Sequence, residues 1–488
     1  MNTAENAVIR SAEPPTIATN APPTSPSAVD IVRERLRSVW ARPSTLRATV
    51  RLARAMMWFG LILGSYRLQR GLERLFGEAR LRARRERVHA RNARRFYRAC
   101  LKMRGVYIKL GQVLSVMGSF LPPVYLKELE GLQDRVPARR FPAVARSIER
   151  ALGMHPDIVF AEFDRAPVAA ASLGQVHRAV THDGREVAVK VLYDDVDSVM
   201  KVDLKVIGWA LRVVRRMMPV GQLGRLHQQL TEMLSQETDL RHEARCLVRM
   251  GTCFAQDASV VVPGLVAELS SREVLTMTFE RGVKVSDAAE LARLGIAPQA
   301  VARKLVEVMF HQLLVAGFFH ADPHPGNFFV RKDAAGGLQL VLLDLGSAQE
   351  TRPELVGGLM QILAGLMGRD DGKVLTGIET MGFIAEGGDR GLLETTVRRY
   401  FERLLDVDPM AFAAMDHESA NALLDPGLKG RELKRLMQSI EYPEGWFYVE
   451  RAAVMLFGMS STLAPSLNLL QVGFPFVARY LAASHRAG

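Results

Sequence analysis

The spacing of apolar residues changes along the chain and divides it into a helical beginning, a β-rich middle and a helical end. Residues 95–132 have the pattern of helices, broken at Leu121-Pro122-Pro123 so that a second helix begins near Val124. Residues 168–193 switch to short β-rich runs, and the chain is mainly helical again after Val285. This order predicts an α+β fold with two lobes. We predict a tail at 1–28, a basic helical extension at 29–140, an N-lobe at 141–283 and a helical C-lobe at 284–488.

Paired β-rich runs with turn residues between them predict two hairpins. The turn of the first contains Asp183-Gly184, and the turn of the second contains Gly336-Gly337. A long helix is predicted between the hairpins, from about Leu223 to Met250. The predicted strands are 175–181, 186–192, 260–262, 274–279, 328–330 and 338–343. A small β-rich lobe followed by a helical lobe with a hairpin at its junction is the element order of a two-lobed protein-kinase-like fold.

Near the C-terminus, an uncharged run extends from Ala452 to Ala478 and is long enough to span a bilayer. Pro465 and the polar residues Asn468 and Gln471 argue against a span, because they would place unpaired polar groups in lipid. Two buried helices broken near Pro465 explain the same sequence. We therefore expect this run to belong to the folded part of the protein.

The net charge of +12 is concentrated near the N-terminus. Residues 29–105 hold 21 Lys and Arg against 5 Asp and Glu, a local balance of +16 that leaves the remainder near −4. A short apolar stretch at 55–63 lies between the arginines and suits an interfacial helix on an anionic membrane, with Trp58-Phe59 at the headgroup level. A solvated helical face packed on its own domain is the alternative. Nucleic-acid binding is disfavoured because aromatic stacking residues are sparse.

Cysteine usage and the first residues indicate the compartment. Cys100, Cys246 and Cys253 form no paired framework and have no metal-type spacing, which is typical of a reducing compartment. Residues 1–28 are rich in Ala, Pro, Thr and Ser and lack the apolar run of a secretory signal, so they predict a disordered tail. We expect a cytoplasmic protein that is peripheral at the inner face of a membrane.

Several charged residues have the types and order that phosphoryl transfer requires, namely a cation for the nucleotide phosphates, metal ligands, and a carboxylate near the accepting hydroxyl. Lys190 lies on a predicted strand, where alternation directs it away from the apolar side chains. Asp322 stands five residues before Asn327, which is the spacing of a kinase catalytic loop. Asp344 follows the second hairpin in an Asp-x-Gly sequence. These four residues predict a site for Mg²⁺ and a nucleotide, ATP or ADP.

The phosphate-binding loop of this predicted site is unusual. A protein kinase has a glycine-rich loop between its first strands, whereas this chain has Ala169, Ala170, Ala171 and Ser172 at that place. Alanine restricts φ and lets the backbone approach phosphates less closely than glycine does. We therefore expect this chain to handle nucleotides differently from ordinary protein kinases.

Three acidic residues fall in the predicted long helix, at Glu237, Asp239 and Glu243. Asp239 and Glu243 are four residues apart, a like-charge pair that destabilises a helix unless a cation lies nearby. Lys190 or a metal could supply that cation; we assign Glu243 to Lys190 and leave Glu237 and Asp239 for another partner. A solvated acidic face is the alternative.

Taken together, these features resemble the UbiB-type atypical kinases, also called the AarF or ADCK-like family, which is associated with coenzyme Q biosynthesis. The resemblance covers about residues 95–481. Its motifs are Lys109-Leu110-Gly111-Gln112 (K-x-G-Q), the alanine-rich loop Ala169 to Gln175, Glu237-Thr238-Asp239 (E-x-D), and the loop His320 to Asn327. Leu345 departs from the pattern, because it replaces the phenylalanine that is usual after the metal-binding acid.

Specific roles follow from the resemblance. It implies that Lys190 pairs with Glu243, that Asp322 is the catalytic-loop acid, and that Asn327 and Asp344 hold Mg²⁺. It also implies that the K-x-G-Q helix folds over the place of a protein substrate, with Lys109 and Gln112 directed into the cleft. We class Lys109, Gln112, Glu237 and Asp239 as regulatory for this reason.

The leading functional hypothesis is an ATPase, or a kinase of small molecules or lipids, that supports ubiquinone biosynthesis or the handling of isoprenoid lipids at a membrane surface. Its expected partners are nucleotide, an isoprenoid or quinone-precursor lipid, an anionic membrane and enzymes of quinone biosynthesis, with no nucleic acid. The alternative is a non-catalytic module that binds or presents lipid according to its nucleotide state. General protein kinase activity is disfavoured because the occluding helix leaves little room for a peptide.

Overall fold

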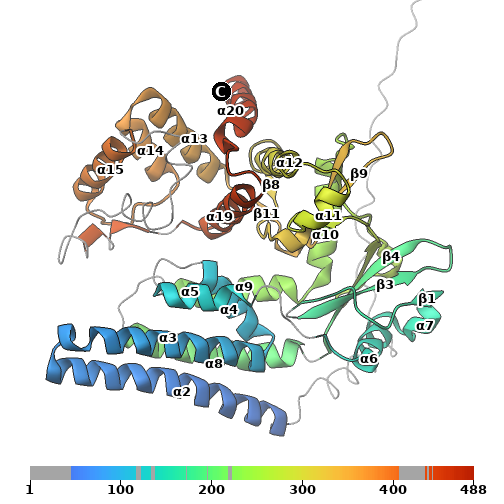
Figure 1. Ribbon diagram of the computed structural model, residues 1–488, viewed down its shortest axis with the longest axis horizontal. Helices are drawn as coiled ribbons and strands as arrows, with labels where there is room; N and C mark the ends of the chain where they lie inside the picture. The colour runs from blue at the N-terminus through green and yellow to red at the C-terminus, as the bar shows by residue number, and fades with distance from the viewer. Residues whose placement is uncertain are drawn as a thin grey trace, which may run out of the picture.

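The structure is a computed structural model, and it has an α+β architecture in which a helical extension, a β-rich lobe and a helical lobe follow one another (Figure 1). It describes residues 45–116, 122–132, 138–171, 173–194, 196–217, 223–405 and 435–487, without 437, 438 and 442. The predicted tail at 1–28, the arginines before residue 45 and Ser172 lie outside the described residues. The order of the lobes agrees with the prediction of a two-lobed kinase-like fold.

A pair of long antiparallel helices forms the outer edge of the extension (Figure 1). Helix α2 (Thr45–Phe76) contains the apolar stretch at 55–63, and helix α3 (Glu78–Met103) returns after a turn at Gly77, whose φ is 84°. Positive φ angles at Arg104 and Gly105 end α3 before the next helix. Helices α4 (Val106–Val116), which carries K-x-G-Q, and α5 (Pro123–Glu130) pack on α3, and α8 (Val196–Met217) packs on α2.

The predicted first hairpin is confirmed and forms the centre of the N-lobe sheet. Strands β3 (Gly174–Val180) and β4 (Glu186–Leu192) pair antiparallel, with Val176 opposite Lys190. The sheet order is β1-β3-β4-β6, and β2 pairs with the start of β3. Helix α6 (Phe141–Leu152) covers the apolar face of this sheet. The other strands are β1 (Glu162–Phe163), β2 (Ala169–Ala170) and β6 (Val274–Thr278), and the short helix α7 (Pro156–Val159) precedes β1.

The predicted single helix from Leu223 to Met250 is wrong, because the structure has two helices there. Helix α9 (Leu223–Glu237) ends at Thr238, and α10 (Leu240–Cys253) begins after Asp239. Asp239 has an extended backbone and caps α10, where its carboxylate accepts the N–H of Arg241 at 3.1 Å. Aspartate is among the strongest N-cap residues, so a position that looks like helix interior is a helix start. The predicted like-charge pair of Asp239 and Glu243 therefore does not arise.

The second predicted hairpin is also confirmed, as β9 (Phe328–Lys332) and β10 (Leu338–Leu342). These strands belong to a second sheet with the order β5-β10-β9-β7, formed with β5 (Val260–Val261) and β7 (Val283–Lys284). The predicted strand at 260–262 thus pairs with the C-lobe hairpin and not with the N-lobe. A third, two-stranded sheet joins β8 (Phe318–Phe319) and β11 (Gln349–Glu350), so the catalytic-loop sequence lies between β8 and β9.

The C-terminal apolar run forms two helices, α19 (Trp446–Leu463) and α20 (Leu469–Ala487), separated near Pro465 as predicted. Within the described residues, no helix is both long and apolar enough to cross a membrane. Both helices pack against α12 (Pro298–Phe310). The other α-helices among the described residues of the C-lobe are α11 (Ala288–Arg293), α13 (Pro353–Gly368), α14 (Asp371–Thr380) and α15 (Arg390–Leu405).

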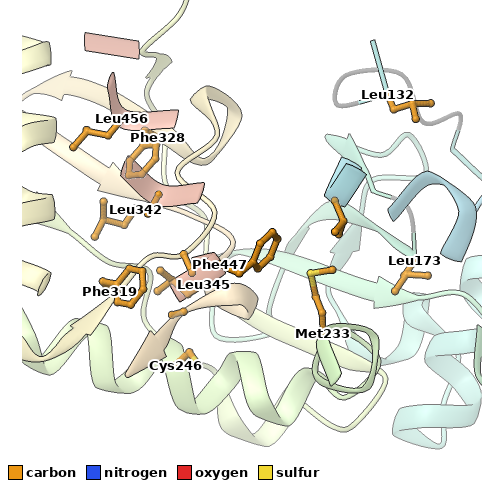
Figure 2. Packing of buried hydrophobic residues seen from close by; sticks show 14 of the residues in the cluster. Leu132, Leu173, Met233, Cys246, Phe319, Phe328, Leu342, Leu345, Phe447 and Leu456 are labelled. Carbon is orange, nitrogen blue, oxygen red and sulfur yellow. The ribbon is translucent and has the colours of Figure 1, made fainter. Parts of the chain in front are cut away.

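One buried apolar cluster runs from the extension through the cleft into the C-lobe. Figure 2 shows Leu132 and Leu173 on one side of it and Phe447 of α19 and Leu345 on the other, with Met233 of α9 between them. The extension therefore shares the core of the two lobes, and α4 and α19 are held in place around the cleft by the same packing.

Candidate active site

Lys190 lies at the centre of the cleft and contacts two carboxylates. Its Nζ donates to Glu243 Oε1 and Oε2 at 2.9 and 2.8 Å and to Asp344 Oδ1 at 2.6 Å. The contact of Lys190 with Glu243 is the one expected from the sequence. The two carboxylates raise the pKa of Lys190 although burial opposes this, so the ammonium keeps its charge. Burial raises the pKa of Glu243 to about 7, and the nearby Asp344 carboxylate adds to the rise although Lys190 opposes it.

Backbone geometry directs Asp344 toward the lysine. Asp344 follows β10 with φ 52° and ψ 63°, in the left-handed region that aspartate and asparagine tolerate. Gly346 comes two residues later, and a side chain there would meet Glu243 Oε2 at 3.0 Å. The Asp-x-Gly sequence therefore matches the space available, since the glycine leaves room for Glu243. Leu345, which departs from the usual phenylalanine, is fully buried in the core.

A buried histidine organises the loop between β8 and β9. The N–H of Asp322 donates to His320 Nδ1 at 3.2 Å, so the ring carries its proton on Nε2, which donates to the Leu343 carbonyl at 3.0 Å. Burial lowers the pKa of His320 and keeps the ring neutral. Asn327 Nδ2 donates to the Asp322 carbonyl at 3.0 Å. The loop thus holds Asp322 and Asn327 next to the end of β10, where Asp344 begins.

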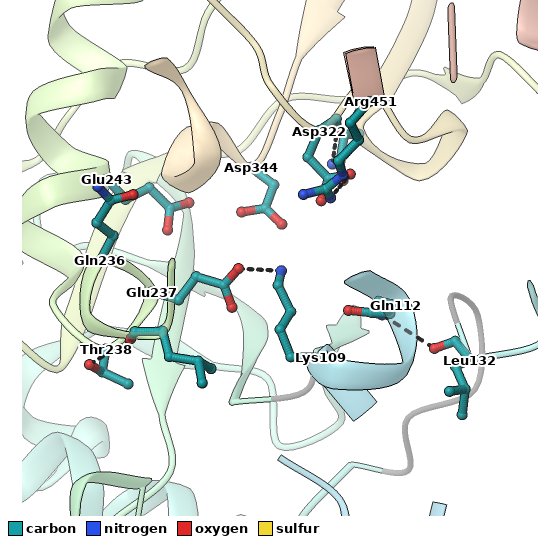
Figure 3. Close-up of polar contacts among 12 residues, drawn as sticks. Lys109, Gln112, Leu132, Gln236, Glu237, Thr238, Glu243, Asp322, Asp344 and Arg451 are labelled. Carbon is teal, nitrogen blue, oxygen red and sulfur yellow. Dashed lines mark hydrogen bonds and ion pairs between the residues drawn. The ribbon is translucent and has the colours of Figure 1, made fainter. Parts of the chain in front are cut away.

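An arginine that sequence reasoning missed pairs with the catalytic-loop acid. Arg451 of α19 forms an ion pair with Asp322 in which their side chains are 7% and 20% exposed (Figure 3). Burial opposes ionisation of Asp322, but Arg451 and Lys109 hold its pKa below its usual value. The only sequence signal for Arg451 is that it is a lone cation at the edge of the uncharged run that begins at Ala452.

Helix α4 carries the two residues predicted for the cleft, and they make different contacts. Lys109 forms an ion pair with Glu237, with the two side chains 8% and 17% exposed, on the side of the cleft that faces Asp322 and Asp344 (Figure 3). Gln112 instead donates from Nε2 to the Leu132 carbonyl at 3.3 Å. Gly111 lets α4 approach closely, because a side chain there would lie 2.3 Å from Leu132. Lys109 closes the cleft, whereas Gln112 holds the chain that leaves α5.

Ala169 and Ala170 of the alanine-rich loop form β2, which pairs antiparallel with the start of β3. The N–H of Ala171 donates to the Gly174 carbonyl at 2.8 Å, and the Leu173 carbonyl accepts the N–H of Tyr193 at 3.0 Å. Gly174 has no room for a side chain, because a Cβ atom would lie 2.5 Å from the Val191 carbonyl oxygen. Ala169 and Ala171 are exposed. Asp239, in contrast, faces Arg241 at 2.6 Å and does not enter the cleft.

The donor atoms at the cleft match a magnesium ion. Asn327 and Asp344 present an amide oxygen and a carboxylate, the hard oxygen ligands that Mg²⁺ prefers. The amide group of Asn327 is fixed through its nitrogen, which leaves the oxygen directed away from the Asp322 carbonyl. The Asp344 side chain is 48% exposed, so an ion arriving with nucleotide can reach it. These residues fit the group that the sequence predicts.

Comparison with known proteins agrees with this geometry. Residues 131–377, about half of the chain, match the sequence profile of the ABC1 atypical kinase-like domain. The chain belongs to the ABC1 atypical kinase-like family. The matched region begins after the K-x-G-Q helix and contains the alanine-rich loop, Lys190, the E-x-D sequence and the catalytic-loop residues. The family that the motifs indicated is thereby confirmed.

Several relatives of this ABC1 family member carry kinase names. AarF domain-containing protein kinase 1 of Xenopus tropicalis is 36% identical over 263 residues, which cover 54% of this chain and 50% of the relative. Protein ACTIVITY OF BC1 COMPLEX KINASE 7, chloroplastic, of Arabidopsis thaliana is 29% identical over 391 residues, 79% of this chain and 54% of the relative. The chain therefore spans about half the length of these relatives. A solved complex of Rv3197 with erythromycin from Mycobacterium tuberculosis covers 75% of this chain and 93% of that one at 24% identity, with a TM-score of 0.45.

The Lys109–Glu237 pair allows a test of how firmly α4 is held over the cleft. We expect Lys109→Met and Glu237→Gln each to lower the free energy of unfolding by about 2 kcal/mol, because each leaves a mostly buried charge without its partner. The double variant should lose less than the sum, with a coupling of about 1 kcal/mol or more in urea unfolding. Arg82→Met, which removes an exposed pair with Glu86 within α3, is the control and should change stability by less than about 0.5 kcal/mol. Strict additivity of Lys109→Met and Glu237→Gln would contradict the closed arrangement.

Proposed function

We propose that this protein is an atypical kinase or ATPase that binds Mg²⁺ and ATP or ADP in the cleft between its lobes. The observation that carries this proposal is the position of Lys190 between Glu243 and Asp344, next to a loop that orders Asp322 and Asn327. In this proposal Lys190 binds the nucleotide phosphates, Glu243 positions Lys190, and Asn327 and Asp344 hold the metal. The loop formed by Ala169, Ala170, Ala171 and Ser172 covers the phosphates.

Binding would change the partners of the charged groups. Nucleotide phosphates compete with Asp344 for Lys190, and Glu243 keeps the ammonium in place because it is almost fully buried beside it. A bound Mg²⁺ would supply neutralisation of the phosphate oxygens. Arg451 holds the pKa of Asp322 below its ordinary value, so its carboxylate is ionised but a weak base. We infer that Asp322 mainly orients the accepting hydroxyl or a water molecule and contributes less as a general base.

The acceptor is proposed to be water or a small molecule or lipid headgroup, not a peptide. Lys109 with Glu237, and Arg451 with Asp322, close the side of the cleft on which an acceptor would approach, and α4 and α19 carry them. Both helices are fixed by the common apolar core. A role in ubiquinone biosynthesis or isoprenoid lipid handling, together with other enzymes of quinone biosynthesis, remains part of the proposal on the strength of the motif resemblance.

The extension is proposed to contact an anionic membrane through the outer face of α2. Trp58 and Phe59 do not lie on that face, contrary to the expectation, because Lys102 of α3 stacks on Trp58 at 5.7 Å and Phe59 packs against Tyr107 at 6.3 Å. Helices α2 and α3 hold 16 Lys and Arg against 3 Asp and Glu, which favours anionic lipid. Met57, Leu61, Leu68 and Leu75 are exposed apolar residues of α2 whose spacings of four and seven residues place them on one helical face.

A non-catalytic, nucleotide-gated lipid-binding module is the second candidate. The observation that favours it is that the cations and acids of the cleft already pair with one another, Lys190 with Asp344 and Arg451 with Asp322. A site closed in this way can respond to nucleotide by changing partners without transferring phosphate. The two candidates differ in whether the bound nucleotide is turned over.

The deciding measurement is phosphate release from ATP with and without Mg²⁺, vesicles and a quinone-like phenol. We expect Mg²⁺-dependent phosphate release that anionic vesicles stimulate several-fold and zwitterionic vesicles do not. The reason is that the basic helices α2 and α3 bind to the surface of anionic lipid. Changing Met57, Leu61 and Leu68 together to Ser should remove the stimulation and leave basal release unchanged. Met367→Ser, at a still more exposed apolar residue on α13, is the control. Tight nucleotide binding without turnover, even with lipid, would favour the second candidate.

A further inference from the structure

Two fully buried polar side chains follow the alanine-rich loop and have no part in the nucleotide chemistry described above. Gln175 and His177 lie on the inward face of β3 and are 1% and 0% exposed. Burial of an amide and an imidazole is unfavourable unless hydrogen bonds replace water. Both side chains have such partners, and the partners show which parts of the fold they join.

The Gln175 side chain forms hydrogen bonds with both the N–H and the carbonyl of one residue outside the sheet. Its Oε1 accepts the N–H of Arg139 at 2.8 Å, and its Nε2 donates to the Arg139 carbonyl at 3.3 Å. Arg139 directly precedes the N-cap of α6 and lies on the chain that arrives from the K-x-G-Q helices. Its guanidinium stacks on the Tyr193 ring at 4.1 Å, at the far end of β4. Gln112 donates to the Leu132 carbonyl, where the chain that leads to Arg139 leaves α5.

His177 fixes the orientation of the Gln175 amide. The His177 Nδ1 atom lies 2.7 Å from the Asp164 carbonyl, which can only accept, so Nδ1 carries the ring proton. The Nε2 atom therefore accepts from Gln175 Nε2 at 2.9 Å. This leaves the amide oxygen for the N–H of Arg139 and the amide nitrogen for the carbonyl. Burial lowers the pKa of His177 and keeps it in this neutral form, while its ring stacks on Phe163.

The alanine-rich loop leads directly into Gln175, so the contact with Arg139 lies at the end of the loop. Gly174 precedes Gln175, and its close approach to Val191 leaves the loop little freedom to shift along β4. We propose that Gln175 and His177 are positioning residues that fasten the chain from the K-x-G-Q helices to the strand carrying the alanine-rich loop, and so set the loop over the bound nucleotide. This inference rests on the proposed nucleotide site.

The test is the affinity for Mg²⁺-ADP of the full chain and its variants. Gln175→Ala removes the grip on Arg139 and is expected to weaken binding about tenfold. Gln175→Glu keeps the shape, but at pH 8 its carboxylate faces the Arg139 carbonyl and the His177 lone pair. We expect a similar loss at pH 8. Gln69→Ala is the matched control, because Gln69 is an equally buried glutamine of α2 that bonds only with Glu73 and Arg84. It should leave the affinity unchanged.

A pH series separates positioning from a general structural role. The charged groups around His177 are Asp164 with its partner Arg178, and Arg139 beyond Gln175. In the parent protein a second ring proton would point at an amide N–H, so affinity should fall as pH drops through the lowered pKa of His177. In Gln175→Glu that proton restores a hydrogen bond, so affinity should recover from pH 8 to pH 6. Dividing the dissociation constant of Gln175→Glu by that of the parent at each pH removes the effect of protonation of the nucleotide itself.

The outcomes are distinct. The ratio in question is the dissociation constant of Gln175→Glu divided by that of the parent protein. A ratio near one at every pH, or a ratio that does not decrease as pH is lowered from 8 to 6, overturns the role of Gln175 and His177. If Gln69→Ala loses as much affinity for Mg²⁺-ADP as Gln175→Ala does, the role is overturned as well, because the effect would then not be specific to Gln175. An NMR titration should show a higher pKa for His177 in Gln175→Glu than in the parent. If the parent itself does not bind Mg²⁺-ADP, the proposed function fails and this inference falls with it.

Discussion

Asp344→Asn is expected to lower Mg²⁺-dependent phosphate release at least a hundredfold while the chain stays folded. The change removes a charged metal ligand, and electrostatic stabilisation by a catalytic metal contributes several kcal/mol to the transition state. Asparagine tolerates the left-handed backbone at this position, so the path of the chain is kept. Lys190 keeps Glu243 as its partner. Because the Asp344 side chain is about half exposed, we expect a stability change of less than about 1 kcal/mol.

The measurement is phosphate release over a range of Mg²⁺ concentrations, together with the melting temperature. Asp333→Asn is the matched control, because Asp333 makes only turn contacts, to the N–H groups of Ala335 and Gly337, and asparagine suits turns equally well. Release that is equal in Asp344→Asn and Asp333→Asn would remove Asp344 from the metal site. Loss of activity with a large fall in melting temperature would instead show a structural role.

Local signals in the sequence predicted both hairpins and the residues that the structure brings together around Lys190. The hairpins have turn residues between β-rich runs. Lys190 lies on β4, Asp344 follows β10, and Asp322 lies in the loop before β9. The contact of Lys190 with Glu243 was predicted from the family resemblance and from a like-charge pair of Asp239 and Glu243, and the structure has the contact without that like-charge pair.

Contacts made by distant helices could not be predicted in the same way. Arg451 lies 129 positions after Asp322, and nothing in its neighbourhood indicates which face of α19 turns toward the catalytic loop. Lys109 and Gln112 share a helical face by spacing, yet packing of Gly111 on Leu132 turns Gln112 toward a main-chain carbonyl. The break at Asp239 was missed because a capping aspartate and a helix-surface aspartate look alike in sequence.

The charged groups of the cleft form three neighbouring pairs, each with one partner from a different part of the chain. Lys109 comes from the extension, Lys190 from the N-lobe and Arg451 from α19, and the acids come from α9, α10 and the C-lobe loops. Lys190 also faces Asp344, so three cations are shared among four carboxylates in a mostly buried space, where an isolated charge is unfavourable. Removing a single cation from this set should therefore affect stability and ionisation together.

Arg451→Met is the strongest test of that statement, because it leaves the Asp322 carboxylate, 20% exposed, without its closest cation. We expect a loss of about 2–4 kcal/mol in the free energy of unfolding at pH 7, measured in urea. Arg352→Met is the control, since Arg352 pairs with Glu444 at the surface at 2.7 Å and its loss should cost less than about 0.5 kcal/mol. Equal losses in the two variants would contradict a buried charge pair at Asp322.

The pH dependence of Arg451→Met has a definite sign. In the parent, Asp322 has a lowered pKa, so its ionised form stabilises the fold above the pKa of the unfolded chain, and this contribution is lost as pH falls through the folded pKa. Without Arg451, burial dominates and raises the pKa of Asp322 above its unfolded value. The variant should then gain stability relative to the parent as pH falls, and the acid limb of its phosphate-release profile should move to higher pH. Lys109 still lowers the pKa of Asp322, so an unchanged acid limb would mean that Lys109 alone keeps the carboxylate ionised.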